Sequence, residues 1–206
     1  MRNYAEKYNY IQKRRIFFRK GYIVNTWFIS DTHFSHTKIL QYCNRPFKTI
    51  EEHDETLIRN WNQRVQKDDT VFFLGDFCFS HSSQAPDAPK ASSAFEYYKN
   101  RLNGNIIFIE GNHDVHNKIK SKIQSIVIKI GGKFIKLTHR PEHAEGKYDL
   151  NFVGHVHQNW KIQPKTIDCH LTVLVNLSVD VWNFRPVNYG EIVSAISNWR
   201  RQNENK

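Results

Sequence analysis

The run Ile106-Ile107-Phe108-Ile109-Glu110-Gly111-Asn112-His113-Asp114 decides the fold of this chain. Its apolar residues predict a short strand, and the glycine allows a sharp exit that turns the next side chain inward. Apolar runs that end in Asp, Asn or His occur at four other places in the 206 residues. These are Tyr22–Ser30 before Asp31-Thr32-His33, Val71–Leu74 before Gly75-Asp76, Phe134–Thr138 before His139, and Leu150–Val153 before Gly154-His155-Val156-His157. Strands that carry such side chains to one edge of an open sheet build a metal site.

The runs contain seven candidate metal ligands, which are Asp31, His33, Asp76, Asn112, His139, His155 and His157. Seven ligands exceed what one tetrahedral ion needs and suit two divalent ions that share a carboxylate. Because residues i and i+2 of an extended chain point to one side, we expect Asp31 and His33 to reach one ion together, and likewise His155 and His157. The mixture of carboxylate, amide and imidazole without thiolate favours a catalytic site for Mn, Fe, Zn or Ni, with Mg as a further alternative. We expect manganese first.

The rest of the pattern alternates strands and helices, which predicts an α/β fold. Thr49-x-x-Glu52 is a capping box that opens a helix, and Gly131-Gly132 predicts a hairpin between residues 126–130 and 134–138. A helix over Ala94–Leu102, a strand over Leu171–Val179 and a helix over Glu191–Arg201 are also predicted.

In this order, Asp-x-His, Gly-Asp, Gly-Asn-His-Asp, a single His and Gly-His-x-His resemble the signature of the calcineurin-like metallophosphoesterases, over about Trp27 to Ile192. The small stand-alone bacterial and phage members are the most similar. The resemblance implies a four-layer α/β sandwich of two packed mixed β-sheets flanked by helices. It implies one domain over residues 22–206 after a basic extension over residues 1–21. It assigns Asp31, His33, Asp76 and His157 to one ion, and Asp76, Asn112, His139 and His155 to the other, with Asp76 as the bridge.

The resemblance also implies a reaction. Two metal ions would lower the pKa of a shared water, and the resulting hydroxide would attack phosphorus. His113 would face the leaving oxygen as a proton donor or charge stabiliser, although a purely structural role is the alternative. Asp114 is expected to hold the Gly-Asn-His turn. The superfamily's protein Ser/Thr phosphatases carry an acidic residue and then an Arg after the bridging Asp. This chain has Phe77-Cys78-Phe79-Ser80 there, which argues against a phosphoprotein substrate.

The similar bacterial and phage members also carry equivalents of two further motifs, residues 42–47 and residues 179–187. Residues in or beside the motifs are candidates for substrate binding. Arg45, Arg140 and Arg185 are expected to contact phosphate, with solvent as the alternative for Arg140. Asn44, Asp180, Trp182 and Asn183 are expected to line the cleft, with core packing as an equal alternative for Trp182. The segment 80–93, rich in Ser, Ala and Pro, is either a lid or a passive surface loop.

Net charge is +10, and residues 1–20 hold +6 of it, with seven Lys or Arg against one Glu. Such an arm can bind nucleic acid; a solvated helix or frayed tail is the alternative, and an organellar presequence a third reading. Three separated cysteines, no secretory signal and no long apolar run predict a cytoplasmic protein without membrane contact.

We therefore expect a metal-dependent phosphoesterase that hydrolyses a phosphodiester or phosphomonoester of a small, nucleotide-like substrate. The alternative is a nuclease that holds DNA or RNA with residues 1–20. An inactive phosphate-binding scaffold is disfavoured, because it would not need a complete ligand set.

Overall fold

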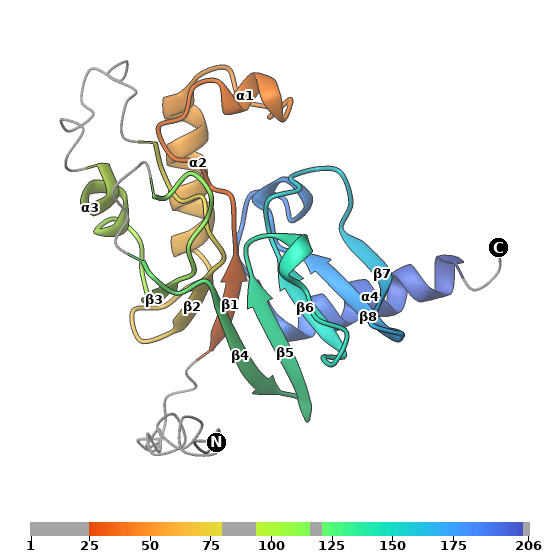
Figure 1. Cartoon of the computed structure of the whole chain (residues 1–206). Helices are drawn as coiled ribbons and strands as arrows, with labels where there is room; N and C mark the ends of the chain where they lie inside the picture. Colours follow the sequence, from red (N-terminus) through yellow and green to blue (C-terminus); the bar gives the residue numbers. More distant parts are fainter. Residues whose placement is uncertain (1–24, 80–93, 116–120, 204–206) are drawn as a thin grey trace.

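The computed structural model describes residues 25–79, 94–115 and 121–203. These residues form two mixed β-sheets and the helices that pack on them (Figure 1). The first sheet has the order β3 (Asn105–Phe108), β2 (Thr70–Phe73), β1 (Thr26–Ile29) and β9 (Val187–Asn188). The second has the order β4 (Ser125–Ile130), β5 (Lys133–Thr138), β6 (Leu150–Val153), β8 (His170–Asn176) and β7 (Ile162–Ile167). The predicted fold class is confirmed.

Parallel pairing brings the ends of the motif-bearing strands together. In the first sheet β1, β2 and β3 run parallel, with Thr26 opposite Thr70 and Thr70 opposite Asn105. In the second sheet β5 and β6 run parallel. The carboxyl ends within each sheet therefore lie at one edge. The two edges meet, because the Ser30 amide, just after β1, donates to the Leu177 carbonyl just beyond β8.

Two apolar clusters hold the layers together. One lies between the first sheet and the helices α2 (Ile50–Asn62) and α3 (Ala94–Lys99), around the fully buried Trp61. The other lies between the two sheets, where the Phe28 and Phe152 rings meet edge to face at 5.1 Å. The short helix α1 (Ile39–Tyr42) follows the first motif.

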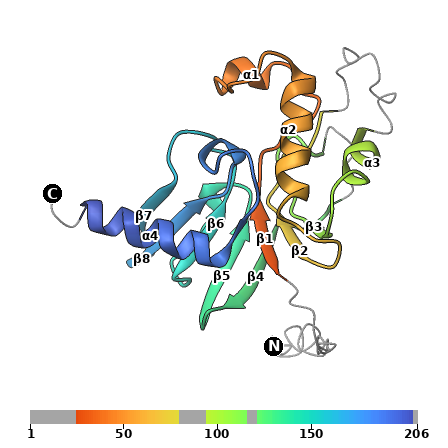
Figure 2. The same ribbon diagram turned by 180° about the vertical axis from the view of Figure 1, so that it is seen from behind.

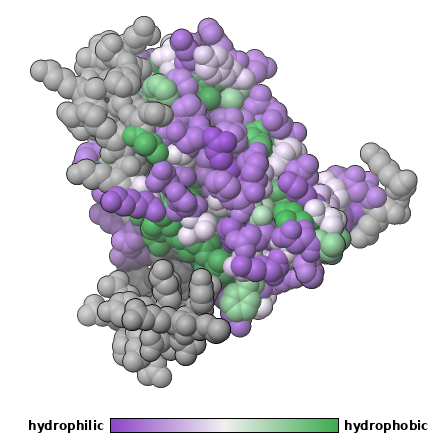
Figure 3. Space-filling view, viewed as in Figure 1, coloured by the Kyte–Doolittle hydropathy of each residue, from purple (hydrophilic) through white to green (hydrophobic). Residues whose placement is uncertain are grey.

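The last helix, α4 (Tyr189–Asn203), packs on the same face of the second sheet as the first sheet does. In Figure 2, where the molecule is seen from behind, α4 lies in front of β8 and β7 and crosses them. The opposite face of the second sheet is covered by residues 140–149, which include the 3-10 turn η1 (Pro141–His143). Asn151 binds the Glu145 backbone there. A loop thus forms the fourth layer. The molecular face seen in Figure 3, which has the same view as Figure 1, is mostly hydrophilic.

Most predicted elements are confirmed with small shifts of their ends. Thr49 accepts a hydrogen bond from the Glu52 amide and opens α2, as the capping box predicts. Gly131-Gly132 joins β4 to β5 in the predicted hairpin. β8 ends at Asn176, earlier than the predicted Val179, because the Asn176 side chain accepts from the Ser178 amide and starts a turn into the 3-10 segment η2 (Val179–Val181).

Two predictions concern residues outside the described ranges. These are the basic extension over residues 1–21 and the choice between lid and passive loop for residues 80–93; both stay predictions. Among the described residues, no helix is long and apolar enough to cross a membrane.

Candidate metal centre

The seven candidate ligands converge where the two sheets meet. Their ligand atoms form two groups, each within 4.8 Å, of Asp31, His33 and His157, and of Asp76, His139 and His155. Asn112 joins the second group, with its Oδ1 2.9 Å from His139 Nε2. The described structure thus brings together side chains from five separate strands.

Asp76 lies between the two groups. Its Oδ2 is 3.6 Å from His33 Nε2 in one group and 3.4 Å from His139 Nε2 in the other. A single carboxylate oxygen facing two imidazole nitrogens is the arrangement that a bridging ligand requires.

The residues fit a pair of divalent ions. His33 Nε2 is buried and has no hydrogen-bond partner among the described residues, as expected for a nitrogen that faces a cation. Burial lowers the pKa of His33, so its imidazole is neutral and able to bind a metal. The carboxylate, amide and imidazole donors suit Mn, Fe, Zn or Ni.

Two imidazoles at the site face buried carboxylates. Burial tends to lower the pKa of His139, but Asp76, Asp31 and the Leu74 carbonyl together outweigh burial and raise the pKa to about 9. Burial also tends to lower the pKa of His157, but Asp180, Cys43 and Asp31 together outweigh it and raise the pKa to about 10. For Asp76, burial raises the pKa, but His139 and His33 hold it below the ordinary value. Positive charge is therefore stabilised at the positions where divalent ions would bind.

The backbone at the site is strained. Asp31, His33, Asp76, His155 and His157 all have positive φ, between 47° and 71°. Side chains rarely adopt this left-handed region, and such outliers gather at functional sites. One prediction from strand alternation is corrected: His155 and His157 lie in different groups, His157 with Asp31 and His33, and His155 with Asp76 and His139.

Three glycines make the close approach of the motifs possible. Gly75 has φ +92°, so it provides the predicted sharp turn before Asp76. Gly111 and Gly154 are needed for space instead. A Cβ on Gly111 would lie 2.2 Å from Asp76 Oδ1, and one on Gly154 would lie 2.7 Å from Asp31 Oδ2.

Asp114 shapes the turn in which Asn112 and His113 lie. Its Oδ2 accepts from the Asp76 and Gly111 amides at 2.9 and 2.8 Å, and its Oδ1 accepts from the Phe77 amide at 3.0 Å. It ties the second motif to the third, which agrees with the predicted role.

Arg45 and Asp180 have a different position from the one we expected. The Arg45 guanidinium is buried and donates to both Asp180 oxygens, to the Asp31 and Thr32 carbonyls and to His53 Nε2. All five donors are used within the protein, so none remains for a phosphate. Asp180 Oδ2 is also 2.8 Å from His157 Nδ1, so this carboxylate orients a candidate ligand and does not line the cleft.

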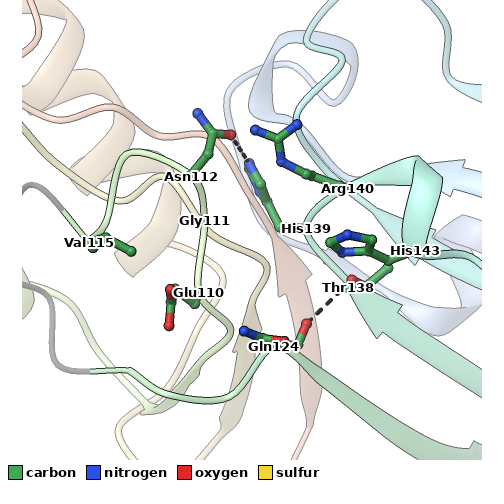
Figure 4. Close-up of a pocket in the computed structure, with 9 residues that line it drawn as sticks. All are labelled: Glu110, Gly111, Asn112, Val115, Gln124, Thr138, His139, Arg140 and His143. Carbon is green, nitrogen blue, oxygen red and sulfur yellow. Dashed lines mark hydrogen bonds between the residues drawn. The ribbon is translucent and has the colours of Figure 1, made fainter.

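The other predicted substrate residues separate into two regions. Arg140 lines a pocket of 160 Å³ beside Asn112 and His139, and Figure 4 shows its side chain extending toward them. Asn44 is exposed after α1 and has φ 45°. Arg185 and Asn183 line a different pocket, which contains none of the seven candidate ligands. Trp182 is buried in the core, and its indole donates to the Asn176 carbonyl.

His113 lines a larger pocket of 370 Å³ on the other side of the candidate ligands. Its amide donates to Asp76 Oδ1 at 2.9 Å, and its ring lies 5.6 Å from the His33 ring. The sequence prediction missed two neighbours. Cys43 forms a further group with His157 and Asp180, and His36 follows the first motif; their nearness to the site depends on the turn after β1.

Comparisons with known proteins show the family to which the chain belongs. The family model of the calcineurin-like phosphoesterases matches residues 24–138, which include five of the eight motif side chains that we singled out for metal binding and catalysis. An uncharacterized protein, MJ1445, from Methanocaldococcus jannaschii is 41% identical over 180 residues, which are 82% of this chain and 90% of that protein. The crystal structure of AQ665, a protein of unknown function from Aquifex aeolicus, superposes with a TM-score of 0.60 at 23% identity and covers 84% of this chain and 100% of that one.

Fold and site together define a phosphoesterase of the metal-dependent class. The chain belongs to the calcineurin-like phosphoesterases, a family of hydrolases that act on phosphoesters with divalent metal ions.

Proposed function

We propose that the protein uses two divalent ions, manganese in the first instance, to hydrolyse a phosphodiester or phosphomonoester of a small nucleotide-like compound. One observation carries the proposal: Asp76 Oδ2 lies 3.6 Å from His33 Nε2 and 3.4 Å from His139 Nε2, so that one carboxylate links two ligand groups. When bound, the ions would supply a hydroxide nucleophile at neutral pH and neutralise the phosphate oxygens.

The protein's own residues would prepare the site and handle the leaving group. Asp180 would hold the His157 ring with Nε2 facing the first ion, because Asp180 occupies Nδ1. His113 would donate a proton to the departing ester oxygen. Arg140 would donate to a phosphate oxygen in the smaller pocket. Its position beside Asn112 and His139 supports this role, and neither Arg45 nor Arg185 lines that pocket.

A substrate and metal screen of the full chain tests the proposal. Purified protein is stripped with chelator, reloaded with Mn, Fe, Zn, Ni or Mg, and assayed on nucleoside monophosphates, cyclic nucleotides, dinucleotides, p-nitrophenyl esters and single-stranded oligonucleotides. Elemental analysis of Asp76→Asn should show lower metal occupancy, because both groups lose a shared charge, and hydrolysis should be abolished.

The matched control is Asp149→Asn, which makes the same change at a side chain that is 63% exposed, pairs with Lys133 and lines neither pocket beside the candidate ligands. It should keep full occupancy and turnover. Two tightly held ions and near-normal turnover in Asp76→Asn would overturn the bridging role. The nuclease alternative depends on residues 1–20, which lie outside the described ranges, and the oligonucleotide assay of the screen tests it.

A further inference from the structure

The two pockets beside the candidate metal centre differ in size and in chemistry. The pocket lined by Arg140 and His143 has a volume of 160 Å³. The pocket lined by His113 has a volume of 370 Å³, within the range of small-molecule sites. The proton donor must lie beside the ester oxygen that departs. If His113 is that donor, the leaving group lies in the His113 pocket. The larger part of the substrate is therefore the part that leaves.

Aromatic rings line the leaving-group side of the larger pocket. The His36 ring stacks on Phe79 with 4.1 Å between centroids and 12° between planes. Tyr42, at the end of α1, lies edge-on to His36 at 6.2 Å. The Tyr42 side chain is 65% exposed, more than the other large aromatic side chains among the described residues. An exposed ring at a pocket rim provides a face on which a flat ligand can stack.

Polar groups suited to a heteroaromatic ligand complete the pocket. Gln158 and Asn159 line it and are exposed, so their amides can donate to and accept from ring nitrogens and carbonyls. An aliphatic leaving group would use neither the aromatic face nor the paired donors and acceptors.

We propose that Tyr42 is a specificity-determining residue that stacks on the base of a nucleoside leaving group in the His113 pocket. The inference rests on the proposed function and adds a substrate class to it. In the reaction, water adds to phosphorus and loses one proton, and its oxygen stays on the phosphate. The bond from phosphorus to the ester oxygen breaks, and that oxygen leaves on the nucleoside with the proton from His113.

The test compares two substrates and one ligand on the full chain loaded with manganese. Adenosine 5′-monophosphate has an aromatic leaving group, glycerol phosphate has none, and binding of adenosine itself is measured by titration calorimetry. Removing a stacked ring by Tyr42→Ala should weaken adenosine binding about 10-fold, and the ratio of kcat/KM for the two substrates should fall about 10-fold. Tyr42→Phe keeps the ring and should stay within about 2-fold of wild type in both measurements.

Phe134→Ala is the matched control, because Phe134 is another exposed aromatic residue, 54% exposed, on β5 outside both pockets. It should behave as wild type. In Tyr42→Ala, an equal loss of kcat/KM on both substrates, or unchanged adenosine binding, would overturn the inference. Normal hydrolysis of p-nitrophenyl esters by the same variant would still support the proposed function. If the wild type hydrolyses no phosphoester with any metal, the proposed function fails, and the calorimetric result still decides whether Tyr42 binds the base.

Discussion

Replacing Arg45 with Met should lower the free energy of unfolding of the protein, and should not act only by weakening substrate binding. The Arg45 and Asp180 side chains are 0% and 3% exposed, and they form a two-point pair with 2.8 and 2.9 Å between nitrogen and oxygen. Methionine has a similar length but cannot donate. The variant leaves the Asp180 carboxylate with His157 and Ser178 as its remaining partners.

The expected cost can be worked out from the lost contacts. Removing one partner of a buried ion pair costs about 3–5 kcal/mol, and the carbonyls of Asp31 and Thr32 each lose a donor worth about 1 kcal/mol. We therefore expect the free energy of unfolding to fall by about 5–7 kcal/mol, which is a large part of the roughly 5–15 kcal/mol of an ordinary domain.

Urea unfolding, followed by tryptophan fluorescence in the presence of chelator, measures the change without any contribution from metal. The double variant Arg45→Met/Asp180→Leu removes both charges and should recover about 2–3 kcal/mol relative to Arg45→Met. Arg185→Met makes the same substitution at a side chain that is 38% exposed, and should change stability by less than about 0.5 kcal/mol. A loss below about 1 kcal/mol in Arg45→Met, with a large fall in kcat/KM, would refute the structural role and restore the predicted phosphate contact.

Two further predictions concern chemistry and pH. His113→Ala should keep both metals by elemental analysis but lose about 10²–10⁴-fold in turnover, and less with p-nitrophenolate as leaving group because it needs little protonation; an equal loss on good and poor leaving groups would contradict the proton-donor role. Asp69 accepts from the Gln66 amide and the Trp27 indole, and although burial tends to raise the pKa of Asp69, these bonds hold it below 3.8. Its stabilising contribution should therefore be complete above about pH 5 and lost as pH falls through the folded pKa. Asp69→Ala should cost about 2–3 kcal/mol at pH 7, and the difference in free energy of unfolding from wild type should shrink as pH falls through the folded pKa; a difference independent of pH would contradict this.

The position of the site could be predicted from the sequence because it follows from local pattern. Each motif comes after a short apolar run, and the carboxyl ends of parallel strands meet at one sheet edge. The ligand types then indicate the chemistry, independent of the exact strand ends. The same local reasoning gave the α2 cap at Thr49 and the hairpin at Gly131-Gly132.

The partners of the candidate ligands could not be predicted in this way. Arg45 and Asp180 lie 135 residues apart, and each stands beside a motif, so both were read as substrate residues. Sequence proximity to a motif does not tell whether a side chain faces the cleft or supports the ligands from behind. A similar limit applies to Gly111 and Gly154, which are needed for packing space between motifs distant in sequence.

The Arg45–Asp180 pair explains how the protein holds a strained site in place. Arg45 donates to the Asp31 carbonyl, and Asp180 holds the His157 ring, so one guanidinium fixes the first and last motifs of the same ligand group. The His155 amide donates to both Asp31 oxygens at 3.1 Å and joins the second group to the first. Left-handed residues persist only where the surrounding contacts determine them. These contacts hold the candidate ligands from behind, so we expect metal affinity to depend on Arg45, although all of its donors are used by protein groups.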